Sequence, residues 1–196
     1  IGTDDLAIGD PYSNNSEGSV QLYGGLDSYV GATTPDQVLS FPGLNTDGGS
    51  PYFGVQVLTA DLNQDFLPDL IVSAPGADDI DENGNEFEDR GAVYIYYGDT
   101  SGEFSSSPDH ALLGNANGEL FGAALAVTDM NRDGVPEIAI SAAGSTYVAL
   151  IPAIEFTGSA LEAQHIDNID TKAVFLSDDE NESFGYSLAS TTNLDH

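Results

Sequence analysis

The feature that most constrains this chain is an internal repeat. The segment DLNQDFLPDLIVSAPG, residues 61–76, recurs 68 positions later as DMNRDGVPEIAISAAG, residues 129–144. Each copy opens with spaced oxygen-bearing side chains and continues into a short apolar, β-branched run that is typical of a buried strand. Repeated units of this kind bury their apolar faces against one another. We therefore expect an all-β array.

Four oxygen-bearing side chains stand at relative positions 1, 3, 5 and 9 of each loop. In a loop closed without an ion these groups would repel one another, and a hard cation would remove that repulsion. Calcium suits such a loop because it takes about six to eight oxygen ligands in flexible geometry, whereas magnesium holds its waters. The chain has no cysteine and neither loop has a histidine, which argues against zinc and copper. The residues are Asp61, Asn63, Asp65 and Asp69 in the first loop, and Asp129, Asn131, Asp133 and Glu137 in the second.

Two alternatives to a repeated calcium loop have to be weighed. An EF-hand loop begins with the same spacing, but it needs a bidentate glutamate at position 12, where this chain has Val72 and Ile140. The other alternative is a turn rich in Asp and Asn, which forms without any metal. Because two copies stand at matched positions before matched strands, the repeat favours the metal.

Further repeat signals surround the two loops. A Phe-Gly pair opens units at 53–54, 121–122 and 184–185, and GAVYIYYG at 91–98 has a counterpart, GSVQLYGG, at 18–25. Units of four strands at this spacing predict β-propeller blades. Other strands are expected at 5–11, 38–41, 69–75, 110–113, 147–152 and 172–177. The predicted division is the C-terminal part of a first blade at 1–51, a second blade at 52–119, a third at 120–182, and at 183–196 the first strand of a further blade or the completion of the first.

Both ends of the sequence fall inside a loop of the same kind. If the tail were followed by the head, Asn193 and Asp195 would take positions 1 and 3, and Asp5 would take position 9. Position 5 would then be Ile1, which weakens this site. We expect either a segment of a longer chain, or two chains that complete each other's split blade in a six-bladed ring.

The acidic segment at 77–90 offers one more candidate calcium site. Its side chains repeat the alternate spacing with Gly84 at position 6, but position 12 is Arg90, so that Glu88 or Asp89 would have to close the loop. The alternative is a solvated acidic loop. The candidate ligands are Asp79, Asp81, Asn83 and Asn85.

The order of these signals, Phe-Gly, then D-x-N-x-D-x-x-x-D, then L-I-V-x-A-P-G, then G-x-V-Y-I-Y, resembles the FG-GAP repeat. That repeat builds the β-propeller of integrin α-chain N-terminal regions, and similar repeats occur in many bacterial secreted proteins. The resemblance implies calcium-binding hairpins between the first and second strands of each blade. It also implies backbone carbonyl ligands at position 7, here Leu67 and Val135. Two residues depart from the family pattern, because Phe66 stands where glycine is usual and Glu137 replaces aspartate.

The charge balance limits the partners of this chain. Its 196 residues include 33 acidic ones against three lysines and arginines, which gives a formal net charge of −30. Nucleic acids and anionic membrane surfaces are poor partners because the electrostatic term would be repulsive. The sequence has no apolar run long enough to insert into a membrane.

The resemblance implies a propeller module for adhesion or ligand binding in an extracellular or cell-surface protein, in which calcium is structural and the ligand is a protein or a glycan. One alternative is the propeller part of a secreted hydrolase, although no nucleophile motif or zinc motif occurs in the sequence. The other is a passive spacer in a cell-surface repeat array. We expect no catalytic residue in this chain.

Overall fold

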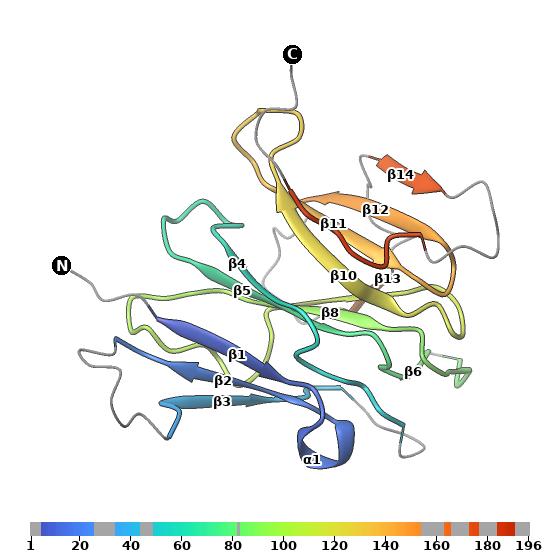
Figure 1. The fold of residues 1–196 in the computed structure, drawn as a ribbon, viewed down its shortest axis with the longest axis horizontal. Helices are drawn as coiled ribbons and strands as arrows, with labels where there is room; N and C mark the ends of the chain where they lie inside the picture. The colour runs from blue at the N-terminus through green and yellow to red at the C-terminus, as the bar shows by residue number, and fades with distance from the viewer. Residues whose placement is uncertain are drawn as a thin grey trace.

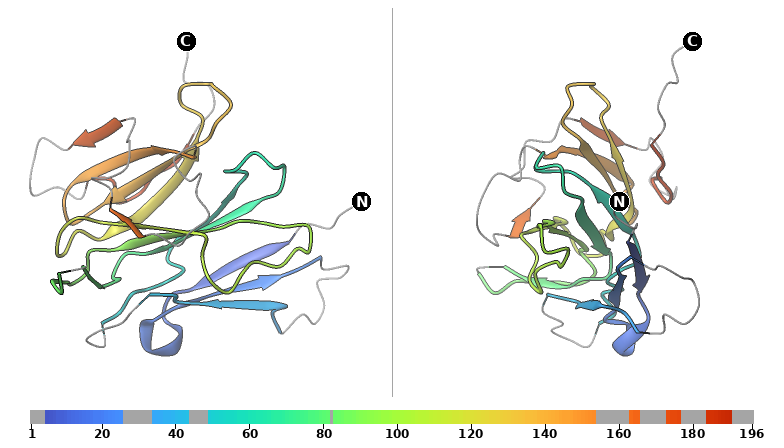
Figure 2. Two further views of the ribbon diagram at one scale, coloured as in Figure 1. Left: turned by 180° about the vertical axis from the view of Figure 1, so that it is seen from behind. Right: turned by 90° about the vertical axis from the view of Figure 1, so that its left-hand side faces the viewer.

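A computed structural model describes residues 5–25, 34–43, 49–81, 83–153, 163–165, 173–176 and 184–190. The described chain is almost wholly β, with three main sheets that follow one another in sequence order (Figure 1). Figure 2 shows the same succession from two further directions. The sheets of the second and third repeats contain the four antiparallel strands expected of FG-GAP propeller blades.

The first sheet has three antiparallel strands in the order β1-β2-β3. The polar turn between β1 and β2 includes the single helical turn α1 (Ser13–Ser16), in which Asn14 and Asn15 take left-handed φ values of 51° and 59°. Asparagine tolerates this conformation better than most residues, which explains its place here. The strands are β1 (Leu6–Asp10), β2 (Ser19–Tyr23) and β3 (Gln37–Ser40).

The second sheet contains the blade expected from the best copy of the repeat, in the order β4-β5-β8-β9. A short hairpin of β6 and β7 projects between β5 and β8. A fifth strand, β13, pairs in parallel with β9, which the repeat pattern did not predict. The β13 strand thereby covers the backbone groups that β9 would otherwise expose at the edge of the sheet. The strands are β4 (Val57–Ala60), β5 (Asp69–Ala74), β6 (Asp79–Ile80), β7 (Glu86–Phe87), β8 (Ala92–Tyr96), β9 (His110–Leu113) and β13 (Ala163–His165).

The third sheet has the order β10-β11-β12-β14, and all its pairs are antiparallel. Its register repeats that of the second sheet, because Leu70 lies opposite Tyr96 and Ile138 lies opposite Ile151. The strand expected at 147–152 is present, and the described part of the one expected at 172–177 forms a strand over 173–176. The strands are β10 (Phe121–Thr128), β11 (Glu137–Ala142), β12 (Tyr147–Pro152) and β14 (Ala173–Leu176).

The core lies between the sheets. Every residue of β5 is buried. Leu70 and Val72 pack with residues of the first sheet, whereas Ile71 packs with residues of the third. A strand covered on both faces should be apolar without alternation, as the run LIV in β5 is. The middle sheet therefore holds its two neighbours together through opposite faces.

A repeated joint links successive sheets. The Phe53 N–H donates to the Glu17 carbonyl at 3.0 Å, and the Phe121 N–H donates to the Arg90 carbonyl at 3.1 Å. Each phenylalanine ring is fully buried in a cluster shared by two sheets. The next residue of each acceptor segment, Gly18 or Gly91, has a positive φ, and a Cβ atom there would lie only 2.1 or 2.3 Å from the phenylalanine carbonyl oxygen. Phe53 and Phe121 therefore pack between successive sheets, and a glycine must face each of them.

Candidate metal centre

The two acidic loops lie at the same end of neighbouring sheets. One connects β4 to β5 and the other connects β10 to β11. In Figure 1 both loops extend beyond the strand ends on the side away from β6. The side chain of Gln64 in the first loop donates to the Gly134 carbonyl of the second at 3.4 Å. The repeat therefore places two candidate sites side by side.

Carboxylate and amide side chains fold the first loop around its own backbone. Asp61 accepts hydrogen bonds from the N–H groups of Asp65 and Phe66 at 3.0 and 2.9 Å. The Asp65 N–H also reaches Asn63 Oδ1 at 3.0 Å, and Asp65 Oδ1 accepts from the Leu67 N–H at 2.8 Å. These bonds turn the side chains at positions 1, 3 and 5 toward the interior of the loop.

The second loop repeats this arrangement bond for bond. Asp129 accepts from the N–H groups of Asp133 and Gly134 at 3.1 and 3.0 Å. The Asp133 N–H reaches Asn131 Oδ1 at 2.8 Å, and Asp133 Oδ1 accepts from the Val135 N–H at 2.9 Å. The matched sequence spacing thus produces matched geometry. The carbonyls of Leu67 and Val135 as calcium ligands remain a prediction.

Position 6 of each loop has a left-handed backbone, with φ of 85° at Gly134 and 68° at Phe66. Glycine adopts this conformation freely, but a bulky residue does so only at a cost. The Phe66 side chain is 93% exposed, so packing does not offset that cost. Phe66, where the family has glycine, therefore strains the turn of the first loop, although the loop still adopts the same conformation as the second.

Three carboxylates converge in the second loop. Asp129, Asp133 and Glu137 each offer an oxygen, and these three oxygens lie within 4.8 Å of one another. Calcium binds oxygen at about 2.3–2.6 Å, so ligands on opposite sides of the ion are up to about 5 Å apart. Glu137 is buried, and its Oε2 accepts from the Met130 N–H at 2.8 Å. The donor set and its spacing fit a calcium ion.

The closing carboxylate of the first loop is held differently. Asp69 Oδ2 accepts from the Leu62 and Asn63 N–H groups at 2.7 and 3.4 Å, and Oδ1 accepts from the Gly98 N–H at 3.0 Å. Burial raises the pKa of Asp69 above its usual range, despite these three hydrogen bonds to the charged form. Within the described residues, the first loop does not gather three carboxylate oxygens as closely as the second.

The candidate site at 79–85 takes the form of a hairpin turn. Asp81 Oδ1 accepts from the Asn83 and Asn85 N–H groups at 2.9 and 2.8 Å, and Oδ2 accepts from the Asn85 side-chain amide at 2.7 Å. These hydrogen bonds lower the pKa of the exposed Asp81 carboxyl. Asp79 lies apart from this turn and pairs with the buried Arg90 at 2.5 Å. The geometry resembles a self-capped turn more than a metal loop, and the calcium site stays a prediction.

The split site at the chain ends lies mostly outside the described residues. Asn193 and Asp195 belong to that undescribed part. Asp5 is described, and its Oδ1 accepts from the Gly25 N–H at 2.9 Å. This third loop therefore stays a prediction.

Three residues have structural roles that the sequence pattern did not reveal, and only Gly98 contacts an acidic loop. Gly98 binds the closing carboxylate of the first loop, and only its place after the GAVYIY strand hinted at a role. Arg90 is 2% exposed and lies 3.8 Å above the Phe87 ring, which supports the β6–β7 hairpin. Glu119 is buried, and it accepts from the Ala116 N–H at 2.7 Å and from the Tyr147 hydroxyl. No periodic signal marks a buried glutamate in a turn.

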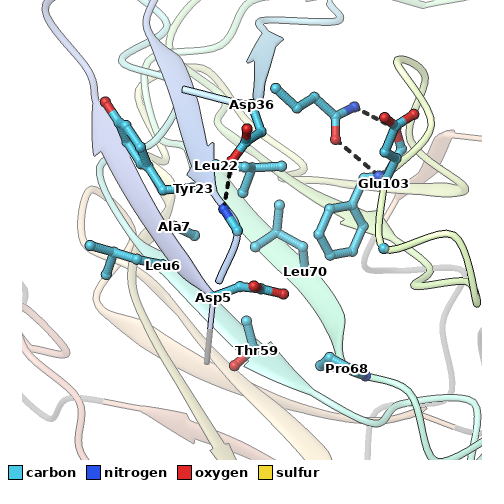
Figure 3. Close-up of a pocket in the computed structure, with 14 residues that line it drawn as sticks. Asp5, Leu6, Ala7, Leu22, Tyr23, Asp36, Thr59, Pro68, Leu70 and Glu103 are labelled. Atoms are coloured by element: carbon cyan, nitrogen blue, oxygen red, sulfur yellow. Dashed lines mark hydrogen bonds between the residues drawn. The ribbon is translucent and has the colours of Figure 1, made fainter. Parts of the chain in front are cut away.

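A cavity of about 510 Å³ lies between the first and second sheets. Figure 3 shows its apolar wall, with Leu22 and Leu70, and the carboxylate of Asp36, which accepts from the Gly24 N–H at 2.8 Å. Pro68 of the first loop borders the cavity. A second cavity, of about 660 Å³, lies between the second and third sheets, at the strand ends opposite the acidic loops.

No helix in the described ranges is long and apolar enough to cross a bilayer.

Comparison with known proteins agrees with the repeat pattern. The model of the FG-GAP repeat matches residues 53–96 and 121–151. Human integrin alpha-7 is 34% identical over 150 residues, which are 73% of this chain and 11% of that protein. Human integrin alpha-6 is 30% identical over 188 residues, 95% of this chain and 15% of that protein. Mouse phosphatidylinositol-glycan-specific phospholipase D is 34% identical over 146 residues, 71% of this chain and 16% of that enzyme.

The chain thus spans about a sixth or less of the length of each of these relatives. The two segments matched by the FG-GAP model, 53–96 and 121–151, contain both acidic loops and the Phe-Gly pairs at 53–54 and 121–122. The chain belongs to the FG-GAP repeat family and is a distant homologue of integrin alpha chains and of phosphatidylinositol-glycan-specific phospholipase D.

Proposed function

We propose that this chain is a calcium-binding β-propeller module of an extracellular protein, that calcium is structural, and that the module serves adhesion or ligand binding. The observation that carries the calcium assignment is the convergence of Asp129, Asp133 and Glu137 within 4.8 Å on a loop whose hydrogen bonds recur in the neighbouring repeat. Similarity to integrin alpha chains supports the adhesion role and the extracellular location.

Calcium would act here by neutralising like charges. Each loop contains three carboxylates, which converge within 4.8 Å in the second loop, and the chain as a whole carries a net charge of −30. A bound ion would supply the opposite charge and fix the connection between the first two strands of each blade. Because the folded chain binds the ion and the unfolded chain does not, binding stabilises the fold.

The loops at the other end of the sheets offer a surface for the ligand. The 660 Å³ cavity there is lined by the aromatic rings of Tyr52 and Tyr186 and by the carboxyl groups of Asp78, Glu88 and Asp89. Aromatic faces and carboxylates together suit a sugar or a polar protein surface. The calcium loops would hold this surface rigid from the opposite end.

A thermal melt tests the calcium assignment. At fixed ionic strength, we expect calcium but not magnesium to raise the melting temperature relative to EDTA. At a concentration 100 times the dissociation constant, one site contributes about 2.7 kcal/mol, or roughly 5–10 °C for a chain of this length. The double variant Asp61→Ala, Asp129→Ala should lose the rise.

The matched control is Asp99→Ala, which removes an exposed aspartate that caps a turn through the Ser101 N–H at 2.7 Å, outside both loops. This variant should keep the full calcium response. A melting temperature that ignores calcium in the wild type, or a rise that persists in the double variant, would contradict the structural calcium sites.

The similarity to phosphatidylinositol-glycan-specific phospholipase D favours a second candidate, the non-catalytic propeller part of a secreted hydrolase. The two candidates differ in the activity expected of the chain when it is studied alone or joined to a catalytic domain. An adhesion module should bind a protein or glycan surface by itself in a binding screen. A hydrolase part should instead change the turnover of a catalytic domain joined to it.

A further inference from the structure

We propose that the cavity of about 510 Å³ between the first and second sheets binds a small organic cation with an apolar body, of the alkylammonium type. Its lining includes none of the oxygen-bearing side chains of the loops at 61–69 and 129–137. The cavity exists because the joint between the first and second sheets is filled less completely than the joint between the second and third.

Two positions of the first sheet carry small residues where the second sheet has large ones. The repeat and the strand register match Gly24 with Tyr97, and Ala7 with Ile71. Ile71 and Tyr97 pack in the cluster between the second and third sheets. Ala7 and Gly24 instead line the cavity. The first joint therefore lacks the two side chains that fill the second.

The carboxylates around this position are retained in both repeats. The Gly24 N–H donates to Asp36 Oδ2 at 2.8 Å, and the Gly25 N–H donates to Asp5 Oδ1 at 2.9 Å. These bonds fix both carboxylates beside the cavity, which they also line. The equivalent donors and acceptors in the second repeat are Tyr97 with Asp109 and Gly98 with Asp69, at 2.7 and 3.0 Å.

The missing side chain leaves an open place between the two carboxylates. A Cβ atom at Gly24 would lie 3.6 Å from Asp36 Oδ2 and 3.6 Å from Asp5 Oδ1, and no other described atom beyond its chain neighbours lies within 4 Å. In the second repeat the Tyr97 side chain fills the equivalent place. There burial, and next the charges of the two equivalent carboxylates, raise the pKa of the Tyr97 hydroxyl to about 12.

The charge and polarity of the lining define the ligand. Leu22 of the first sheet and Leu70 of the second form an apolar wall (Figure 3). Glu103 adds a third carboxylate to those of Asp5 and Asp36, and none of the lining residues is basic. A cationic head between Asp5 and Asp36 would supply the opposite charge. A hydrocarbon body would cover the wall.

The side chain of Gln37 ties the two sides of the cavity together. Its Nε2 donates to the Phe104 carbonyl at 2.5 Å, and its Oε1 accepts from the Phe104 N–H at 3.0 Å. Gln37 begins β3 of the first sheet, whereas Phe104 follows β8 of the second. A preformed cavity of this volume, within the range of about 300–1,000 Å³ for small-molecule sites, favours a free small ligand over a protein surface.

Calorimetric titration with propylammonium and hexylammonium, in calcium-containing buffer of fixed ionic strength, provides the test. Each buried methylene strengthens binding up to about fourfold. Hexylammonium should therefore bind at least about tenfold more tightly than propylammonium. The neutral hexanol should bind more weakly than hexylammonium, and the anionic hexanoate should not bind.

Three variants locate the ligand. Gly24→Tyr restores the residue of the second repeat and should abolish binding, and it should fold because the new Cβ atom makes only ordinary contacts. Asp36→Asn keeps an acceptor for the Gly24 N–H and should weaken binding about fivefold. The matched control, Asp81→Asn, removes the same charge from the exposed hairpin turn and should leave the affinity unchanged.

The glycine amides give an independent readout. In a sample labelled at glycine nitrogen, hexylammonium should shift the amide signal of Gly25, which donates to Asp5. The signal of Gly98, its counterpart in the second repeat, should stay in place because the Tyr97 side chain fills that position.

Several results would overturn this assignment. Equal affinity for propylammonium and hexylammonium, or wild-type affinity in Gly24→Tyr, would exclude the cavity. Because Asp5 is also a candidate calcium ligand, loss of hexylammonium binding in proportion to added calcium would assign the carboxylates to a metal ion. Tighter binding of leucyl-argininamide than of hexylammonium would assign the cavity to a protein partner. Each of these results would leave the calcium-dependent melt, and with it the proposed function, unaffected.

Discussion

The joint between sheets makes a quantitative prediction through two glycines with nearly the same backbone conformation. Gly91 has φ of 81° and Gly84 has φ of 82°, so an alanine at either position is strained alike. A Cβ atom at Gly84 would meet nothing within 4 Å, whereas one at Gly91 would lie 2.3 Å from the Phe121 carbonyl oxygen and 2.4 Å from the Phe121 nitrogen. The pair separates backbone strain from crowding.

Gly84→Ala should cost little. A left-handed alanine costs about 1–2 kcal/mol, and the lower entropy of the unfolded chain offsets about 0.4–1 kcal/mol of this. We expect a net loss of roughly 0.5–1 kcal/mol. For a chain of this length, 1 kcal/mol corresponds to about 2–4 °C in melting temperature.

Gly91→Ala carries the same strain and also forces the joint apart. Overpacking of this kind costs about 1–3 kcal/mol, and loss of the hydrogen bond from Phe121 to Arg90 adds about 0.5–1.5 kcal/mol. The expected total is about 2–5.5 kcal/mol, or roughly 4–20 °C. Urea denaturation and thermal melts of the two variants in parallel would measure the difference. Equal losses of stability in both variants would refute the close contact at the joint.

Two further predictions concern the loop turn and the buried tyrosines. Phe66→Gly removes a left-handed phenylalanine whose side chain is 93% exposed, and it should raise the stability of the metal-free chain by about 0.5–1 kcal/mol after the entropy of glycine is counted. The reverse exchange, Gly134→Phe, should lower that stability, and a loss of stability on Phe66→Gly in urea denaturation would contradict the strain. Burial raises the pKa of Tyr97 to about 12 and raises the pKa values of Tyr94 and Tyr96 as well. The contribution of these three phenols to folding stability is therefore fully present below the unfolded pKa of about 10 and is lost as pH rises toward 12 and above. Absorbance titration of the folded chain should find these phenols protonated at pH 11, and ionisation of all nine tyrosines near pH 10 without unfolding would argue against their burial.

Much of the fold could be predicted because the apolar pattern of a strand shows which of its faces are buried, and because the repeat fixes the order of the strands. The run LIV in β5 reads as a strand buried on both sides, and the matched register of β5 and β11 follows from the repeat. The pairing of β13 with β9 could not be predicted, since it depends on which segment reaches an open edge rather than on periodicity. A three-residue parallel strand leaves no pattern in the sequence.

The candidate site was predictable in its loops but not in its contacts. Alternate oxygen-bearing side chains determine the turn hydrogen bonds at Asp61 and Asp129, because they are local. The contact from Gly98 to Asp69 joins positions 29 residues apart and has no local signal. The pairing of Asp79 with Arg90 is likewise a product of the hairpin fold.

The joint between sheets also bears on how such chains can be recombined. Phe121 and Gly122 stand at the start of a repeat in sequence, yet the Phe121 N–H donates to the Arg90 carbonyl of the preceding repeat, and a Cβ atom at Gly122 would lie 3.1 Å from the Ser73 side chain of the preceding sheet. A crossover placed before this pair would separate Phe121 and Gly122 from the residues of the preceding sheet against which they pack. A crossover placed two residues later, inside β10, would transfer the Phe-Gly pair together with the preceding sheet that it contacts. Chimaeras built that way should retain the packing at the joint.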